Sequence, residues 1–270
     1  MTAWERRDLA SSRRIVVKVG SSSISGESAG RIGPLVDALA GAHRRGTEVV
    51  LVSSGAISTG MPYLDLDSRP TDLATQQAAA AVGQNVLIYR YQDALRPYEI
   101  VAGQVLLTAG DLENPAHRSN AQRAMERLLS LRILPIVNEN DTVATHEIRF
   151  GDNDRLAALV AQLIGADALV LLSDIESLYT RPPDEPGAMP INRIQHDDDL
   201  SALEFGAVVV NSVGTGGAAT KVSAARLAAA SGIGTLVTGT DLVTQALAGA
   251  EIGTWFAPHP AAVTRPVDTL

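Results

Sequence analysis

The chain has 270 residues, a formal net charge of −8 at pH 7 and no cysteine, which excludes disulfides, thiolate metal sites and cysteine nucleophiles. Its 46% of hydrophobic and 19% of charged residues are typical of a folded globular protein, and its acidic balance argues against a nucleic-acid scaffold. No apolar run reaches the ~18 residues that a membrane span needs, and residues 1–14 lack the apolar segment of a secretory signal. We expect a cytoplasmic protein with no membrane partner and no nucleic-acid partner.

The first predicted element is a buried strand over residues 14–19, which runs into the loop Gly20-Ser21-Ser22-Ser23. Lys18 stands inside this apolar run, where an ammonium group is costly unless a negative charge lies beside it. Of the 22 lysine and arginine residues, only Lys18 and Lys221 are lysines. Lysine presents a compact point charge where arginine presents a planar fork. We therefore expect the two lysines to meet at a phosphate.

Apolar periodicity predicts alternating helices and strands along the rest of the chain. Helices are expected at residues 32–44, 71–95, 119–132, 154–165, 219–231 and 242–248. Strands are expected at residues 49–52, 100–107, 134–137, 168–172, 208–210, 235–237 and 254–257, with a hairpin at 142–150 and a surface excursion at 181–190. Strands that alternate with helices are typical of a mostly parallel α/β sheet.

Clusters of small and polar residues directly follow four of the predicted strands, at residues 20–23, 53–55, 138–141 and 173–174. Ligands of parallel α/β sheets bind beyond the carboxyl ends of the strands. The glycine and serine loop at 20–23 offers backbone N–H groups and hydroxyls to a phosphate. For such a loop by itself a plain turn between strand and helix is the more common explanation, but Lys18 beside it favours the phosphate.

A second phosphate-type element is Gly214-Thr215-Gly216-Gly217, followed by Lys221 in the first turn of a predicted helix. Residues 214–219 also satisfy the G-x-G-x-x-A fingerprint of dinucleotide-binding folds, with Asp241 about 20 residues beyond it. We rank that interpretation second, because the fingerprint usually opens its fold and because it leaves Lys18 and Ser54 without a role.

Carboxylates and amides crowd into two loops, Asn138-Glu139-Asn140-Asp141 and Gly151-Asp152-Asn153-Asp154. Solvated turns or helix caps are the simplest explanation, and Asp154 would make a plausible cap. Two such loops, both beyond strand ends, favour recognition of an ammonium-bearing ligand or of a metal. The five histidines show no metal-ligand spacing.

Five motifs stand in the order in which the amino acid kinase family has them, at residues 17–22, 53–57, 138–141, 151–154 and 214–221. From about residue 14 to residue 257 the chain resembles that family, and within it the members that phosphorylate the side-chain carboxylate of glutamate. The resemblance implies a single α/β domain, a three-layer αβα sandwich with a mostly parallel central sheet. Residues 14–170 would bind the amino acid and residues 171–260 the nucleotide. The C-terminal RNA-binding-like domain of many members is not expected here.

The resemblance also implies a role for each motif residue. Lys18 and Lys221 would flank the transferring phosphoryl group, and Asp154 would orient both lysines. Ser54, Asp141 and Asn153 would hold the amino acid. The nucleotide would be held by Lys18, Ser173, Asp174, Thr215, Gly216, Gly217, Ala218, Ala219, Thr220 and Lys221.

The reaction so implied is ATP-dependent phosphorylation of the γ-carboxylate of L-glutamate, the first step of proline biosynthesis. Mg²⁺ would be held mainly through the nucleotide phosphates, with no metal ligand from the protein. Proline is expected as a feedback inhibitor, and the chain as a homodimer or homotetramer. A glutamate carboxylate is already anionic at neutral pH and needs no general base. The alternatives are a kinase acting on acetylglutamate or aspartate, and a non-catalytic sensor of amino acid and nucleotide.

Overall fold

The computed structural model describes residues 5–144, 153–200 and 217–260. At its centre is an eight-stranded sheet with the strand order β3-β4-β2-β1-β5-β9-β10-β8. Its strands are β1 (Arg14–Val19), β2 (Glu48–Ser53), β3 (Ala102–Leu107), β4 (Leu134–Glu139), β5 (Ala168–Ser173), β8 (Arg193–Ile194), β9 (Gly234–Gly239) and β10 (Thr254–Phe256). From β3 to β9 all neighbours are parallel, whereas β10 runs antiparallel to β9 and β8 pairs with β10. A separate antiparallel pair joins β6 (Leu178–Tyr179) and β7 (Pro190–Ile191).

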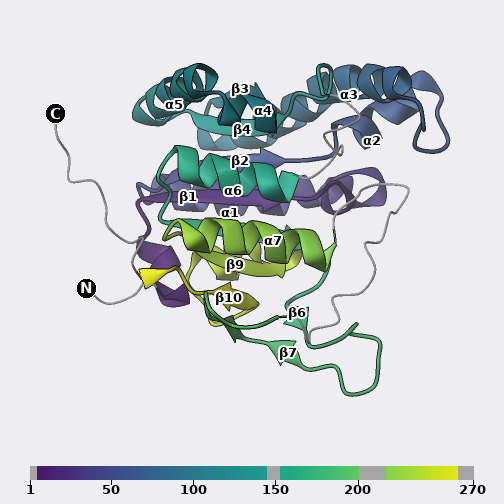
Figure 1. Ribbon diagram of the computed structural model, residues 1–270. Coiled ribbons are helices and arrows are strands. Elements are labelled where there is room, and N and C mark those ends of the chain that lie inside the picture. Colours follow the sequence, from purple (N-terminus) through teal and green to yellow (C-terminus); the bar gives the residue numbers. More distant parts are fainter. Residues whose placement is uncertain (1–4, 145–152, 201–216, 261–270) are drawn as a thin grey trace.

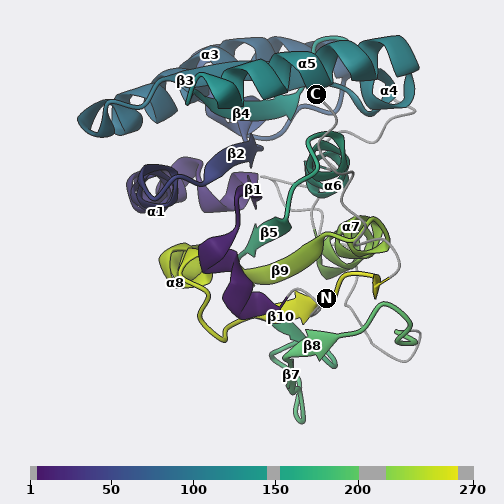
Figure 2. The ribbon, with the colours of Figure 1, turned by 90° about the vertical axis from the view of Figure 1, so that its left-hand side faces the viewer.

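Helices cover both faces of the sheet (Figure 1). One layer contains α1 (Ile32–Arg44), α3 (Leu73–Leu95) and α8 (Val243–Leu247), and the other contains α4 (Ala109–Glu113), α5 (Pro115–Ser130), α6 (Asn153–Leu163) and α7 (Ala218–Ala230). Figure 2 shows the strands between α1 and α8 on one side and α6 and α7 on the other. The short helix α2 (Ala56–Gly60) packs on α3. The predicted three-layer αβα sandwich with a mostly parallel sheet is confirmed.

Short 3₁₀ turns connect these elements, and several of them follow strands. They are η1 (Arg6–Ser11), η2 (Ser21–Ser23), η3 (Gly26–Arg31), η4 (Met61–Leu64), η5 (Arg96–Tyr98) and η6 (Thr240–Leu242). Among the described helices, none is both long enough and apolar enough to cross a membrane.

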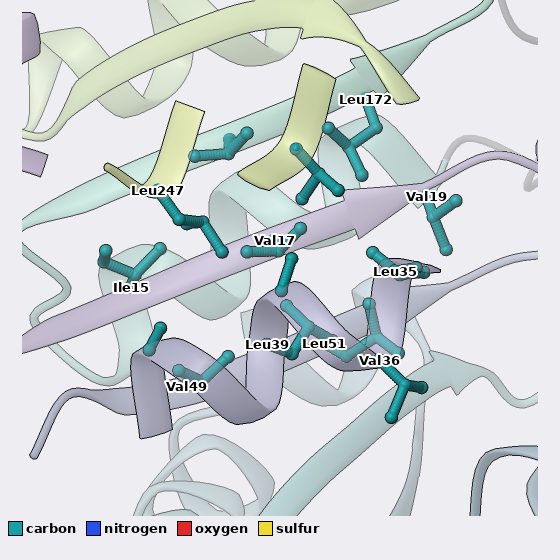
Figure 3. Close-up of a cluster of buried hydrophobic side chains, with 14 of the residues drawn as sticks. Ile15, Val17, Val19, Leu35, Val36, Leu39, Val49, Leu51, Leu172 and Leu247 are labelled. Carbon is teal, nitrogen blue, oxygen red and sulfur yellow. The ribbon is translucent and has the colours of Figure 1, made fainter. Parts of the chain in front are cut away.

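Strand β1 lies in the middle of the sheet and is buried on both faces. Successive side chains of a strand point to opposite faces. Ile15, Val17 and Val19 belong to the core beneath α1 and α8, where Figure 3 shows them beside the apolar face of α1. Val16 belongs to the opposite core, beneath α6 and α7. Lys18 has the same parity as Val16, so β1 directs its side chain toward the layer of α6 and α7.

Local sequence signals explain where helices α3 and α5 begin. The side chain of Asp72 accepts a hydrogen bond from the backbone N–H of Thr75 and caps α3. Helix α5 begins at Pro115, four residues before the predicted start, because Asn114 caps it and proline is tolerated in a first helical turn. Strand β4 also differs from the prediction, since it continues through Asn138 to Glu139. The predicted strand at 208–210 and most of the predicted hairpin at 142–150 lie outside the described residues.

Helices α2 and α3 touch backbone to backbone through two glycines. A Cβ atom on Gly83 would lie 1.8 Å from the carbonyl oxygen of Ala56, and one on Gly60 would lie 1.9 Å from that of Ala79. No side chain fits at either position unless the helices separate. Because Ala56 directly follows the loop after β2, this contact fixes that loop against α3.

Candidate active site

Four loops that the sequence singled out meet at one edge of the sheet. Strands β4, β2, β1 and β5 are consecutive and parallel in the strand order, so their carboxyl ends lie side by side. The loops after them begin at Asn140, Ser54, Gly20 and Asp174. The expectation that these polar clusters border a common site therefore agrees with the topology.

A buried carboxylate joins the two lysines at this edge. Lys18 Nζ lies 2.6 Å from Asp154 Oδ1, and Lys221 Nζ lies 3.3 Å from Asp154 Oδ2. The exposed fractions are 4% for Lys18, 1% for Asp154 and 7% for Lys221. Each residue comes from a different element, with Lys18 in β1, Asp154 in the first turn of α6 and Lys221 in the first turn of α7. The structure thus brings together all three residues predicted to be catalytic.

The two ammonium groups control the ionisation of this carboxylate. Burial alone would raise the pKa of Asp154, but the positive charges of Lys18 and Lys221 outweigh it and bring the pKa to about 2. Burial, and then the charge of Lys18, lower the pKa of Lys221 from its ordinary value, although Asp154 opposes the shift. The cluster carries one more positive charge than negative, so it can receive an additional anion.

Thr220 holds Asp154 from the side of α7. Its hydroxyl lies 2.8 Å from Asp154 Oδ2 and 2.9 Å from the carbonyl oxygen of Gly217, so its proton can serve either acceptor. Helix α7 begins at Ala218, after Gly217, and the first turn of a helix offers N–H groups that have no partner within the helix itself. The other glycine-loop residues of the nucleotide prediction, Thr215 and Gly216, lie outside the described residues.

The residues predicted to hold the nucleotide after β5 form a hydrogen-bonded group with the loop after β1. Ser22 Oγ and Ser23 Oγ donate to Asp174, at 2.8 and 3.0 Å. Thr240 Oγ1 lies 3.0 Å from Ser23 Oγ and 3.1 Å from the carbonyl oxygen of Ser173. Thr240 was not predicted from the sequence, although it directly follows strand β9, just as the other site loops directly follow strands.

Ser54 and Asn153, two of the residues predicted to bind the amino acid, contact each other directly. Asn153 Nδ2 donates to Ser54 Oγ across 2.9 Å, which joins the start of α6 to the loop after β2. Asn153 immediately precedes Asp154, so the same turn of α6 serves both the lysines and the loop. Asp154 lies inside α6 with its carboxylate on the lysines; the alternative that it is only a solvated cap is wrong.

Asp141, the third predicted amino-acid contact, lines a pocket of about 230 Å³ between α3, β3 and the loop after β4. Burial, and then the negative charge of Glu139, raise the pKa of Asp141 to about 7, and Arg69 only partly offsets them. A positive group bound beside Asp141 would favour its ionised form. The alternative that Asn138 and Glu139 form a solvated turn is wrong, because both are buried in β4.

The described residues offer no ready-made metal centre. Within residues 5–144, 153–200 and 217–260, no three His, Cys, Asp or Glu side chains come close enough together to hold a metal ion. Asp174, the one carboxylate among the residues predicted to hold the nucleotide, accepts hydrogen bonds from two serine hydroxyls.

The sequence profile described as the amino acid kinase family matches residues 13–239. The chain belongs to the amino acid kinase family. The match spans β1 to β9 and includes Lys18, Asp154 and Lys221.

Curated relatives within this family are similar over nearly the whole chain. Glutamate 5-kinase of Clavibacter sepedonicus is 71% identical over 259 residues, which are 96% of this chain and 100% of the relative. Glutamate 5-kinase of Leifsonia xyli subsp. xyli is 71% identical over 96% of each chain. The relative of the same name from Salinispora arenicola is 53% identical over 94% of this chain, but the match covers 70% of its own length.

Two solved structures are similar to this chain in fold. Carbamate kinase from Giardia lamblia bound to AMP-PNP has a TM-score of 0.64 at 17% identity, covering 93% of this chain and 100% of that one. Isopentenyl phosphate kinase has a TM-score of 0.61 at 17% identity, covering 90% and 99%. At these identities the likeness concerns the amino acid kinase fold.

Proposed function

We propose that the chain is an ATP-dependent kinase that phosphorylates the γ-carboxylate of L-glutamate. The observation that carries the proposal is the buried Lys18–Asp154–Lys221 cluster at the carboxyl edge of the sheet. Such a cluster suits a transferring phosphoryl group, and the curated relatives at 71% identity are named for the glutamate substrate.

The chemistry needs no proton transfer. An oxygen of the γ-carboxylate attacks the γ-phosphorus of ATP, the bond from that phosphorus to the bridging oxygen breaks, and ADP leaves with the electron pair. The carboxylate is already anionic at neutral pH. The difficulty is bringing an anion onto a triphosphate and stabilising the charge that spreads over the migrating group.

Lys18 and Lys221 meet that difficulty. In our proposal their ammonium groups donate to the oxygens of the migrating phosphoryl group, one from β1 and one from α7. Asp154 keeps both ammonium groups at the same edge and partly neutralises them when no substrate is bound. Because Asp154 is 1% exposed, it positions the lysines without lying in the path of the phosphoryl group.

Ser54, Asn153 and Asp141 form the proposed amino-acid site within residues 14–170. The Ser54–Asn153 hydrogen bond lies beside Asp154, which suits the end of the substrate that receives the phosphoryl group. Asp141 lies in the pocket after β4 and suits the ammonium group.

The nucleotide is proposed to lie over residues 171–260. Ser173, Asp174 and the start of α7, from Gly217 to Lys221, support this placement by position, and Thr215 and Gly216 complete the proposed loop. Mg²⁺ on the nucleotide phosphates would supply further stabilisation of negative charge.

The proposal also covers the pathway, the compartment, the inhibitor and the oligomeric state of the enzyme. The reaction would open proline biosynthesis in the cytoplasm, and proline would inhibit it by competing near the glutamate site. The chain would act as a homodimer or homotetramer. Membership of the amino acid kinase family is what supports these proposals.

One assay tests the proposal. Purified protein is incubated with Mg-ATP and L-glutamate, acetylglutamate or L-aspartate, and hydroxylamine traps any acyl phosphate as a hydroxamate. Hydroxamate with glutamate alone supports the proposal, and hydroxamate with another substrate reassigns the acceptor. Binding of glutamate and ATP without turnover would favour a sensor. A rise in melting temperature with NAD(H) but not with ATP would favour the dinucleotide alternative.

A further inference from the structure

Gln84 is a polar residue that the proposed site has not yet used. It lies in α3, is 8% exposed, and lines the same pocket as Asp141 and Glu139. No sequence motif marks it, since it sits in the middle of an alanine-rich helix. A buried amide that faces a pocket needs a hydrogen-bond partner for each end of the amide group.

A chain of hydrogen bonds determines which end of the Gln84 amide faces the pocket. The backbone N–H of Glu139 donates to Asn138 Oδ1 at 2.9 Å, and a backbone N–H can only donate. Asn138 Oδ1 is thereby identified as the acceptor, so Asn138 Nδ2 is the donor toward Gln84. It donates to Gln84 Oε1 across 2.7 Å. Gln84 Nε2 is therefore the end that is turned away from Asn138.

The free end of this amide is a pair of N–H donors beside two acids. Asn138 is 1% exposed, so its side chain is held firmly and fixes Gln84 in turn. Among the described residues Gln84 Nε2 has no hydrogen-bond partner, yet it is not one of the fully buried unpartnered atoms. It is thus accessible from the pocket, which combines N–H donors from Gln84 with the carboxylates of Asp141 and Glu139.

The pocket lies within reach of the loop that carries Ser54. Gly83, next to Gln84, touches the carbonyl oxygen of Ala56, and Ala56 is two residues after Ser54. Across the sheet, Lys18 is in register with Val52 and Val52 with Val137, so Asn138 lies two strands from Lys18. Neighbouring strands are about 4.8 Å apart, so the backbones at Lys18 and Asn138 are roughly 10 Å apart along the sheet, a distance that a bound amino acid together with the surrounding side chains can span.

We infer that Gln84 Nε2 donates a hydrogen bond to the α-carboxylate of the amino-acid substrate, beside Asp141 at its ammonium group, and so selects for that carboxylate. The inference rests on the proposed function, because it places the substrate's γ-carboxylate at Lys18. A donor at this position favours a charged carboxylate over a neutral carboxamide, because hydrogen bonds to ionised acceptors are stronger.

Gln84→Glu tests the inference with little change of shape. One carboxylate oxygen keeps the hydrogen bond from Asn138, and the other now faces the pocket as an acceptor. We expect KM for L-glutamate to rise about tenfold or more with kcat within about threefold, since a hydrogen bond to a charged group is lost. Turnover of L-isoglutamine, which carries an α-carboxamide and a free γ-carboxylate, should improve relative to glutamate. Gln84→Met, which cannot ionise, should raise KM for glutamate without improving isoglutamine.

Gln122→Glu is the matched control, because it makes the same substitution at an exposed helix residue, in α5, that does not line this pocket. It should leave both KM values within about twofold of the parent. If Gln84→Glu keeps the parent KM and melting temperature, or if Gln122→Glu shifts the KM values equally, the inference is overturned. A parent enzyme that makes no glutamyl hydroxamate would instead contradict the proposed function, so the two failures are distinct.

Discussion

Lys18 at the end of β1 and Asp154 at the start of α6 form a buried ion pair, with 2.6 Å between Nζ and Oδ1. Neither group would be stable at this depth without the other, because an isolated buried charge is strongly unfavourable. Lys221 uses the second oxygen of the same carboxylate. Each of the three charged groups is therefore stabilised by the others, and removing one leaves a buried charge without its partner.

Replacing either lysine by methionine should abolish most of the activity while keeping the aliphatic stem. In Lys18→Met and Lys221→Met we expect kcat to fall by about 10²–10³-fold, since a donor to the transition state is typically worth about 3–4 kcal/mol. Arg155→Met is the matched control, because it removes an exposed positive charge next to Asp154 in the sequence. Hydroxamate formation measures kcat, and circular dichroism checks folding. Near-parental kcat in either lysine variant would remove that lysine from the mechanism.

Asp154→Asn should change how stability depends on acid. The folded-state pKa of Asp154, about 2, lies below its ordinary value of 3.8, so its stabilising effect is present above pH 4 and is lost as the pH falls toward 2. Between pH 4 and pH 2 the parent should lose roughly 2 kcal/mol more of its free energy of unfolding than Asp154→Asn. Urea denaturation at several pH values measures this difference. If the parent and Asp154→Asn lost equal amounts of unfolding free energy between pH 4 and pH 2, the stabilisation of the ionised Asp154 by the two lysines would be contradicted.

The pH dependence of substrate binding should report on Asp141. Its pKa, raised to about 7, leaves the carboxyl group mostly neutral below that pH, and a neutral acid attracts an ammonium group weakly. We expect kcat/KM for glutamate to fall by up to about tenfold per pH unit below pH 7, with kcat at saturating glutamate less affected. Asp141→Asn should have a lower kcat/KM that no longer falls in this range. The prediction fails if kcat/KM of Asp141→Asn still falls below pH 7 as steeply as that of the parent.

The contact between α2 and α3 should not tolerate a methyl group. Gly83→Ala places Cβ 1.8 Å from the carbonyl oxygen of Ala56, so it should destabilise the protein by about 1–3 kcal/mol and raise KM through the Ser54 loop. Gly33→Ala makes the same change in α1, where nothing lies within 4 Å of the added Cβ. That control should be neutral or stabilise by about 0.5–1 kcal/mol. Equal effects of the two substitutions on thermal unfolding would be inconsistent with the close crossing.

Most of the fold could be predicted from the sequence, because apolar periodicity and helix caps are local. Strands β1, β2, β4, β5 and β9 lie where apolar runs predict them. The errors concern boundaries and the far edge of the sheet. The two-residue strand β8 has no periodicity to detect, and the antiparallel direction of β10 depends on its pairing with β9.

Those residues of the candidate site that lie in recognisable sequence motifs could be predicted. These local motifs contain Lys18, Ser54, Asp141, Asn153, Asp154, Asp174 and Lys221, and the resemblance of the motifs to the amino acid kinase family supplied the role expected of each residue. Gln84 and Thr240 were missed. Gln84 faces the pocket only because Asn138 fixes its amide, and that bond joins residues of different elements.

By itself the sequence determined that Lys18 is buried in a strand and that its side chain shares a face with Val16, because the alternation of a strand is a local property. It also determined that Lys221 opens a helix and that acids and amides crowd after two strands. Only the tertiary structure decided that Asp154 lies between the two lysines. The order β4-β2-β1-β5 and the packing of α6 against α7 bring these distant segments together, and no local pattern encodes that order.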